Sequence, residues 1–215
     1  MSGIWAIIPV KPLRTSKTRL AHVLSAEQRA DLIRNCLLHT LAVLQQLPAI
    51  AGCWVISSDA VVLATAMAQG VQVLAEEKPR GLNAAVQWGL QTAVHAHADG
   101  ILILPADLPF MTPGDVTMMI DAVRVHEGNG RAYMAICPDE QRTGTNALLL
   151  YPTTPFTFHY GPGSFQQHLA EARRRQRIPV VTTTPGLQFD LDTETDWQKY
   201  QQRTPSPNPK IPVIY

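Results

Sequence analysis

The chain has 215 residues, of which 46% are hydrophobic and 16% are charged, and its formal net charge is +1. This length suffices for one full core, and the near-neutral charge excludes an overall field that would attract nucleic acid or an anionic membrane. The N-terminus has no basic leader segment, and no stretch approaches the roughly 20 apolar residues that cross a bilayer. Cys36, Cys53 and Cys137 are widely spaced and form no CxxC pair, so we expect reduced thiols and a cytoplasmic location.

Short β-rich segments alternate with longer helical patterns along the chain. In chain order we expect strand 4–9, helix 26–47, strand 52–57, helix 59–69, strand 71–75, helix 82–97, strand 100–104, helix 113–125, strands 132–137 and 146–151, helix 164–175 and strand 178–182. This alternation predicts a three-layer α/β/α sandwich with a mostly parallel central sheet. We expect one domain, residues 1–203, followed by a proline-rich tail, residues 204–215. A doubly wound fold with an unrelated function is the alternative.

Four cations lie within nine residues of each other, directly after the first expected strand. They are Lys11, Arg14, Lys17 and Arg19. Ligands of an open α/β sheet bind at this end of the strands, so we expect a polyphosphate here, with Lys11 and Lys17 as its main contacts. Neither a GxGxxG nor a GxxxxGK motif is present, which argues against a dinucleotide Rossmann site and a P-loop. Side chains must therefore hold the phosphates, and a solvated loop is the alternative.

Carboxylates form a second group of candidate residues. Asp107 follows an apolar strand and lies between Pro105 and Pro109, whose restricted backbone makes a rigid platform for a metal ligand. Asp190 and Asp192 are two residues apart, so in an extended segment both point to one face. Mg²⁺ prefers one or two carboxylates together with phosphate oxygens, which predicts a magnesium site at Asp107 with Asp190 or Asp192. For Asp192, the start of the last helix is an equal alternative.

Three glycine-containing segments are candidates for binding small groups. Residues 161–164 break the chain and then open a helix, so free amides and the Ser164 hydroxyl form a small anion site that suits a carboxylate. Thr145 follows a glycine and adds a short donor. A hairpin turn with a helix cap explains both segments equally well. In residues 80–83 a helix again begins after glycine, and Asn83 offers a donor and an acceptor to a base or ribose; a capping turn competes.

Other polar residues are assigned structural roles. Residues 57–59 follow a strand and border the expected site, but a helix cap is favoured there over nucleotide contact. The seven histidines show no metal-ligand spacing, and we assign them to surface or packing positions. Arg173, Arg174 and Arg175 close a helix, where cations are favoured by the helix dipole.

Six motifs in a fixed order carry a family resemblance. They are PVK followed by KTRL, RGLN (80–83), PADLP (105–109), RTGTNALLL (142–150), YGPGSF (160–165) and FDLDT (189–193). Over roughly residues 4–200 the chain resembles the phospholactate/phosphoenolpyruvate guanylyltransferases of coenzyme F-420 biosynthesis. The resemblance implies a nucleotidyltransferase fold of the glycosyltransferase-A type, GTP as donor, Mg²⁺ as cofactor and a small phosphorylated carboxylic acid as acceptor.

Residue chemistry and resemblance together define an expected site. The catalytic residues are Lys11, Lys17 and Asp107; the nucleotide contacts are Pro9, Lys11, Arg14, Lys17, Arg80, Gly81 and Asn83. The resemblance implies that Thr145, Gly161 and Ser164 hold the acceptor and that Asp107, Asp190 and Asp192 surround the metal. We expect no nucleic-acid or membrane partner, and a homodimer is the prior expectation for assembly.

The sequence leaves several functions open. Phosphoenolpyruvate is favoured as acceptor over 2-phospholactate and 3-phosphoglycerate, which differ from it by a few atoms. A nucleotidyltransferase acting on molybdenum cofactor or a sugar phosphate would show a glycine-rich first loop, which this chain lacks. A glycosyltransferase that uses a sugar nucleotide would release a nucleoside diphosphate instead of pyrophosphate. A noncatalytic module would bind GTP without releasing pyrophosphate.

Overall fold

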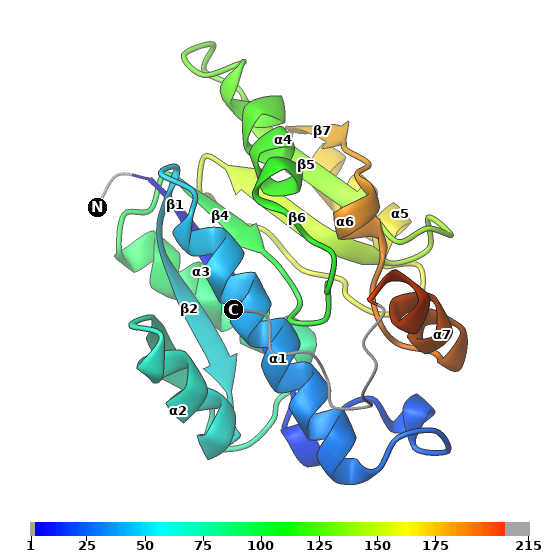
Figure 1. Cartoon of the computed structure of the whole chain (residues 1–215). Helices are drawn as coiled ribbons and strands as arrows, with labels where there is room; N and C mark the ends of the chain where they lie inside the picture. The colour runs from blue at the N-terminus through cyan, green and yellow to red at the C-terminus, as the bar shows by residue number, and fades with distance from the viewer. Residues whose placement is uncertain (1–2, 205–215) are drawn as a thin grey trace.

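The computed structural model describes residues 3–204 (Figure 1). Its strands are β1 (Ile4–Pro9), β2 (Ile50–Ser57), β3 (Gln72–Ala75), β4 (Gly100–Ile103), β5 (Ala132–Pro138), β6 (Thr145–Tyr151) and β7 (Arg177–Val181). Its helices are α1 (Ala26–Gln45), α2 (Ala60–Ala68), α3 (Leu82–His95), α4 (Pro113–Arg124), α5 (Ser164–Arg174), α6 (Pro185–Gln188) and α7 (Glu194–Arg203), with 3-10 turns η1 (Leu13–Thr15) and η2 (Thr18–Leu20). Every expected strand and helix is present, with ends that differ by at most two residues.

The strands form one seven-stranded sheet in the order β3-β2-β1-β4-β6-β5-β7. All neighbouring pairs are parallel except those of β6, which runs antiparallel to β4 and β5. The expected mostly parallel sheet is confirmed. Because β6 is reversed, its first residues lie at the same sheet edge as the carboxyl end of β4, where Ile103 pairs with Leu148. This reversal brings Thr145 toward the segment that contains Asp107.

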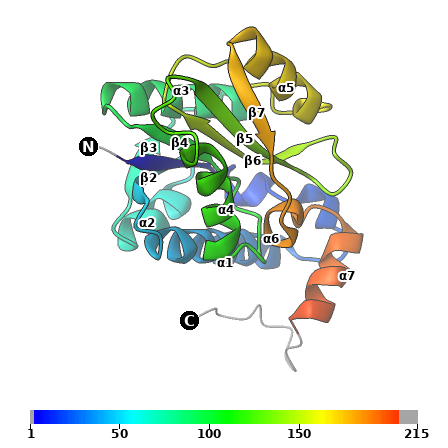
Figure 2. The ribbon, with the colours of Figure 1, turned by 90° about the horizontal axis from the view of Figure 1, so that it is seen from above.

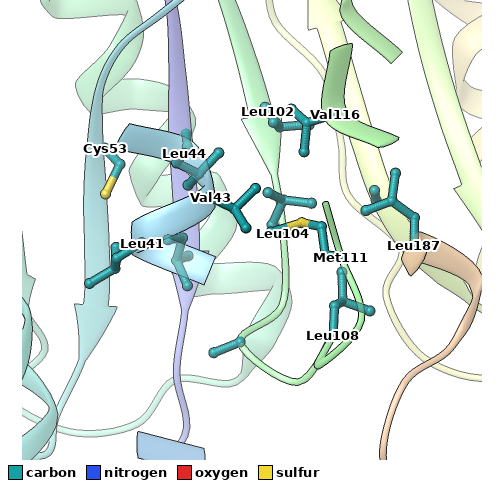
Figure 3. Close-up of a cluster of buried hydrophobic side chains, with 14 of the residues drawn as sticks. Leu41, Val43, Leu44, Cys53, Leu102, Leu104, Leu108, Met111, Val116 and Leu187 are labelled. Carbon is teal, nitrogen blue, oxygen red and sulfur yellow. The ribbon is translucent and has the colours of Figure 1, made fainter. Parts of the chain in front are cut away.

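Helices cover both faces of the sheet, as Figure 2 shows. On one face α1, α2 and α4 bury apolar side chains, among them Leu41 and Leu44 of α1 and Leu102 of β4 (Figure 3). On the other face α3 and α5 pack against a second cluster. Gly89 lets α3 approach β1 closely, because a Cβ there would come within 2.8 Å of the Ile7 Cγ2 atom. The three-layer α/β/α sandwich is therefore confirmed.

A third apolar cluster joins the segment after β1 to the last part of the chain. Leu20 and Leu24 pack with Phe189, Leu191 and Tyr200, and Leu20 and Leu191 are fully buried. Burying a leucine side chain contributes roughly 2 kcal/mol. This cluster therefore holds the cationic segment and the 189–192 segment side by side.

Three short elements were not predicted from the sequence: η1, η2 and α6. The last helix, α7, was expected only as the alternative role of Asp192. Thr193 caps α7, and the side chain of Asp196 completes the capping box. A helix therefore does begin just after Asp192, as the alternative for this residue predicted. Its cap is Thr193, however, so the Asp192 carboxylate is left for other partners.

Several smaller expectations concern the chain as a whole. The three cysteines are buried and unpaired, and burial raises the pKa of Cys36 and Cys53 to about 12. Within residues 3–204, no helix has the length and apolar character needed to cross a membrane. The predicted proline-rich tail, residues 204–215, lies outside the described residues except for Thr204.

Candidate functional site

A crevice of about 580 Å³ opens at the carboxyl edge of the sheet. It is lined by the loop after β1, the turn before α3, the loop after β4 and Asp192 just before the cap of α7, together with Ile33 of α1 and Ile56 of β2. Its lining includes Pro9, Lys11, Lys17, Arg19, Glu76, Gly81, Asp107 and Asp192. The basic segment predicted after the first strand and the acidic residues predicted at the sheet edge therefore meet in one crevice.

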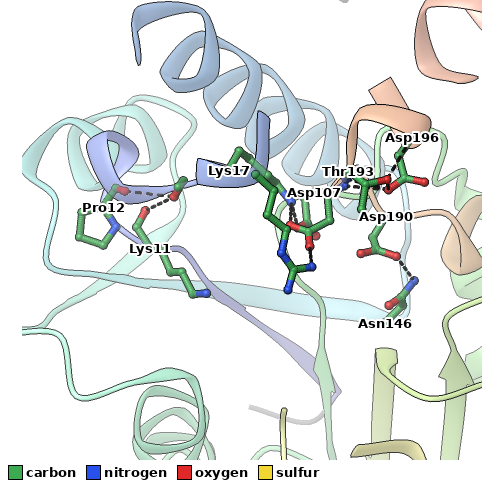
Figure 4. Close-up of polar contacts among 11 residues, drawn as sticks. Lys11, Pro12, Lys17, Asp107, Asn146, Asp190, Thr193 and Asp196 are labelled. Atoms are coloured by element: carbon green, nitrogen blue, oxygen red, sulfur yellow. Dashed lines mark hydrogen bonds and ion pairs between the residues drawn. The ribbon is translucent and has the colours of Figure 1, made fainter. Parts of the chain in front are cut away.

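Lys17 occupies the centre of the acidic group (Figure 4). Its Nζ atom donates to the Oδ2 atom of Asp107 at 2.5 Å and lies 3.5 Å from Oδ1 of Asp192. The Lys17 side chain is only 6% exposed, and its backbone adopts the left-handed conformation, with φ of 53°. That conformation costs about 1 kcal/mol for a residue with a side chain. The surrounding packing therefore holds a strained backbone that directs the amine inward.

The segment 189–192 is attached to the loop that carries Asp107. The Leu191 amide donates to the backbone oxygen of Asp107 at 3.1 Å. Phe189 and Leu191 are buried, whereas Asp190 and Asp192 alternate with them and remain partly exposed. The prediction that the two carboxylates share one face is therefore confirmed.

The charges in this cluster perturb one another. Burial alone would lower the pKa of Lys17, but the charge and hydrogen bond of Asp107 outweigh it and raise this pKa above 10.5. Burial raises the pKa of Asp190 to about 6, and the Asp107 charge adds to this rise; the hydrogen bond from Asn146 and the charge of Lys17 oppose it. Asn146 donates to Asp190 Oδ1 at 3.3 Å (Figure 4). The cluster thus contains more negative charge than its one buried lysine compensates.

The carboxylates have the chemistry of a divalent-cation site. Asp107 Oδ1 is buried and has no hydrogen-bond partner among the described residues, so one oxygen is left for a cation. Asp190, with its raised pKa, would also be stabilised as a carboxylate by added positive charge. Over residues 3–204, however, no three His, Cys, Asp or Glu side chains converge as a ready ligand set. The Lys17 ammonium stands among them instead.

Thr145 and Ser164, predicted to hold the acceptor, are in contact. The Ser164 hydroxyl donates to Thr145 Oγ1 at 3.2 Å, and both residues are buried. Helix α5 begins at Ser164 as expected, after Gly161 and Gly163 with positive φ. The expectation of free amides at the start of α5 is partly wrong, because the Ser164 N–H donates to Gly161 O and the Phe165 N–H donates to Thr143 O. The chain's own carbonyls thus occupy two of the donors that an anion would need.

The hairpin alternative for the Thr145 segment also holds. Strands β5 and β6 pair as a hairpin, and the Gly144 amide donates to Asp139 in its turn. A Cβ on Gly144 would lie 2.7 Å from Asp139 Oδ2, so this glycine allows a close approach within the turn. Turn geometry and a role for Thr145 are compatible.

The expected nucleotide contacts divide into two groups. Pro9, Lys11, Lys17 and Gly81 line the crevice, whereas Arg14, Arg80 and Asn83 do not. Arg80 lines a neighbouring hollow with Glu77 and Trp88. Asn83 uses its amide on the backbone of Tyr160, donating at 3.0 Å and accepting at 2.7 Å. Because Asn83 lies in the first turn of α3, these two bonds join that helix to the segment before α5.

Lys11 and Arg19 differ in whether they already form an ion pair. Within residues 3–204, Lys11 forms no ion pair, and Figure 4 draws no contact between its amine and the acidic group. Arg19 donates to Asp192 Oδ2 at 2.7 Å. Lys11 is therefore a free cation of the crevice, whereas Arg19 is already paired.

Three polar residues of the site were not identified from the sequence. Asp59 caps α2, as was favoured from the sequence, but it also accepts from the Leu13 amide at 2.9 Å and so anchors the cationic loop. Asn146 orients Asp190. His168 was assigned to packing, yet it bonds to Thr145 at 3.0 Å. Asn146 belongs to the RTGTNALLL motif. The partners of these three residues are distant in the sequence, so local spacing does not predict them.

A family model described as "Guanylyl transferase CofC like" matches residues 4–200. The chain belongs to this family. It is 40% identical over 199 residues to a "Phosphoenolpyruvate guanylyltransferase" of Rubrobacter xylanophilus, with 90% of this chain and 91% of that protein covered. It is 32% identical over 191 residues to a "2-phospho-L-lactate guanylyltransferase" of Methanothermobacter thermautotrophicus, with 89% and 81% covered.

The fold of this CofC-like chain is also that of solved nucleotidyltransferases. A putative nucleotide-diphospho-sugar transferase from Desulfovibrio desulfuricans superposes with a TM-score of 0.73 over 96% of this chain and 90% of that one, at 19% identity. At this identity the likeness shows the fold alone. It agrees with the glycosyltransferase-A type expected from the motifs.

Proposed function

We propose that this CofC-like chain transfers GMP from GTP to the phosphate of a small phosphorylated carboxylic acid, with release of pyrophosphate, as a step of coenzyme F-420 biosynthesis. Phosphoenolpyruvate is the first choice of acid and 2-phospho-L-lactate the second. The observation that carries this proposal is the buried Lys17 amine between Asp107 and Asp192 in the crevice of a chain of this family. Relatives named for both acids support the substrate class, and 40% identity to one named for phosphoenolpyruvate supports the order.

In the proposed reaction, a phosphate oxygen of the acid attacks the α-phosphorus of GTP and pyrophosphate leaves. A phosphate with a second pKa of about 6 is mostly dianionic at neutral pH, so no general base is needed. The main obstacle is repulsion between two anions. Catalysis therefore depends on positioning and on positive charge at the phosphates.

Lys11 and Lys17 supply this charge in different ways. Lys11, free of ion pairs in the described part of the chain, is available to the GTP phosphates from the start. Lys17 reaches them by exchanging its contact with Asp107 for phosphate oxygens, which the length of a lysine side chain allows. We assign it to the leaving pyrophosphate.

Asp107, Asp190 and Asp192 are the residues that would hold Mg²⁺. The unpartnered Oδ1 of Asp107 and the raised pKa of Asp190 support this assignment. When bound, the ion would supply positive charge that reduces the repulsion between the phosphates. Asn146 keeps Asp190 oriented through its hydrogen bond.

A pyrophosphate-release assay tests the reaction. It crosses four nucleoside triphosphates with phosphoenolpyruvate, 2-phospho-L-lactate and 3-phosphoglycerate, each with Mg²⁺ and with EDTA. We expect release only with GTP, an acid and Mg²⁺, with phosphoenolpyruvate the best acid. Release of a nucleoside diphosphate from a sugar nucleotide, or saturable GTP binding without turnover, would contradict the proposal.

We also propose that the reaction takes place in the cytoplasm. The three unpaired cysteines support a reducing compartment. A homodimer remains the expectation for assembly, and light scattering after size exclusion measures it directly.

A further inference from the structure

His168 is a buried histidine that the mechanism above does not use. It lies on α5, has no exposed surface and packs edge-on against Tyr160, with ring centroids 4.9 Å apart. A buried imidazole needs partners for both of its nitrogens. Both partners are present, and together they determine where its proton lies.

The backbone of His159 assigns the tautomer of His168. The His159 N–H donates to His168 Nε2 at 2.9 Å, and a backbone amide can only donate, so Nε2 carries no proton. Burial, with a smaller contribution from the nearby His159, lowers the pKa of His168 to about 4, although the charge of Glu171 on the same helix opposes this shift. Near pH 7 the ring is therefore neutral, and its single proton is on Nδ1.

This proton in turn determines the direction of the Thr145 hydroxyl. His168 Nδ1 lies 3.0 Å from Thr145 Oγ1, so Nδ1–H donates to that oxygen. The Ser164 hydroxyl donates to the same oxygen at 3.2 Å. A hydroxyl has two acceptor positions and one proton. With both acceptor positions filled, Thr145 can only donate, and within residues 3–204 no group accepts its proton.

An anion is the ligand that suits such a hydroxyl. Thr145 precedes Asn146 at the start of β6; its hydroxyl faces α5, whereas Asn146 turns the other way and bonds to Gln188 O and Asp190, so Thr145 and the acidic group lie at the same edge of the sheet. An acid bound there must place its phosphate at the reacting centre and its carboxylate on neutral donors. A carboxylate can only accept hydrogen bonds. A hydroxyl that can only donate is therefore a suitable partner for it.

We propose that His168 is a positioning residue for the acceptor: it holds Thr145 as an obligate hydrogen-bond donor to the carboxylate of the phosphorylated acid. This inference rests on the proposed function, and it assigns His168 no contact with substrate. If the proton were on Nε2 instead, Nδ1 would accept a hydrogen bond from the Thr145 hydroxyl. That hydroxyl could then no longer donate to the acid.

Two variants separate positioning from simple structural support. In His168→Asn the side-chain amide takes the place of Nδ1 and can still donate to Thr145, but the bond from His159 is lost. In His168→Gln the amide reaches the place of Nε2 and can still accept from His159, but Thr145 loses its donor. We expect His168→Gln to raise KM for phosphoenolpyruvate roughly ten- to a hundredfold, the loss of one hydrogen bond to a charged group, with KM for GTP changed less than about twofold. His168→Asn should stay within about threefold of wild type for both substrates.

The opposite ranking, with Asn impaired and Gln normal, would show that His168 only supports the loop and would overturn the inference. Equal KM values in wild type and both variants would also overturn it while leaving the proposed function intact. No turnover by wild type with any acid would overturn both.

A measurement on the wild-type chain covers the case in which a variant does not fold. Long-range ¹H–¹⁵N spectra of the imidazole groups report which nitrogen carries the proton. We expect a neutral His168 with the proton on Nδ1 at pH 7. A proton on Nε2, or on both nitrogens, would overturn the inference.

Discussion

Replacing Lys17 with methionine tests the electrostatic core of the site. Methionine keeps the length of the side chain and the same strained backbone, but it removes the charge that faces Asp107 at 2.5 Å and Asp192 at 3.5 Å. Removing one partner of a fully buried pair costs about 3–5 kcal/mol. The carboxylate side chains here are 23% and 37% exposed, so water offsets part of this cost. We therefore expect Lys17→Met to lose about 2 kcal/mol of unfolding free energy in EDTA.

Urea unfolding, followed by tryptophan fluorescence, measures this loss. Mg²⁺ should then restore stability to the variant, because the carboxylates freed from the ammonium can take the ion; a concentration of 100 times Kd adds about 2.7 kcal/mol. Wild type should respond less to Mg²⁺ in the absence of nucleotide, since its own amine competes for the same oxygens.

Lys199→Met is the matched control. Lys199 pairs with Glu140 at 3.1 Å, but both side chains are at least 40% exposed, so this change should cost less than about 0.5 kcal/mol. Equal stabilities of the two variants in EDTA, or an equal Mg²⁺ response in wild type and Lys17→Met, would refute the reasoning.

Three further predictions follow from the site and its supports. Asp107→Asn removes a proposed metal ligand, so pyrophosphate release should fall at least about a hundredfold and cease to depend on Mg²⁺; an unchanged Mg²⁺ titration would count against this role. Asp59→Ala removes the α2 cap and the acceptor for the Leu13 amide, so stability should fall by about 1–2 kcal/mol and hydrogen exchange at Leu13 should accelerate, whereas Thr112→Ala, the α4 cap, should leave Leu13 unchanged. The folded-state pKa of His168, about 4, lies below the ordinary value of 6.5, so its contribution to stability is present above pH 6.5 and is lost as the pH falls toward 4. This loss amounts to about 3 kcal/mol and should be absent in His168→Gln; a stability difference between the two proteins that stays constant from pH 7 to pH 4 would contradict it.

The elements and part of the site were readable from local pattern. Leu32, Leu37 and Leu44 recur at helical spacing in the expected helix 26–47, and all three are buried on α1. The alternation of Phe189, Asp190, Leu191 and Asp192 correctly predicted two carboxylates on one face. These features depend on neighbours within a few residues, because side-chain direction follows from the helical and extended repeats.

The tertiary structure decided the pairings between distant residues. Lys17 and Asp107 are 90 residues apart, and they meet because Leu20 packs against Leu191 in a separate apolar cluster. The sequence predicted that basic and acidic segments share a crevice, but not that the amine stands between the carboxylates.

By itself, then, the sequence determined the strands, most helices, the family motifs and the chemistry available at the carboxyl edge of the sheet. The reversed direction of β6, the αL backbone of Lys17 and the bond from His168 to Thr145 came only with the fold. The physical reason is that hydrophobic periodicity records which face of an element is buried, whereas a polar partner is chosen by whichever loops the packed core brings within about 3 Å of each other.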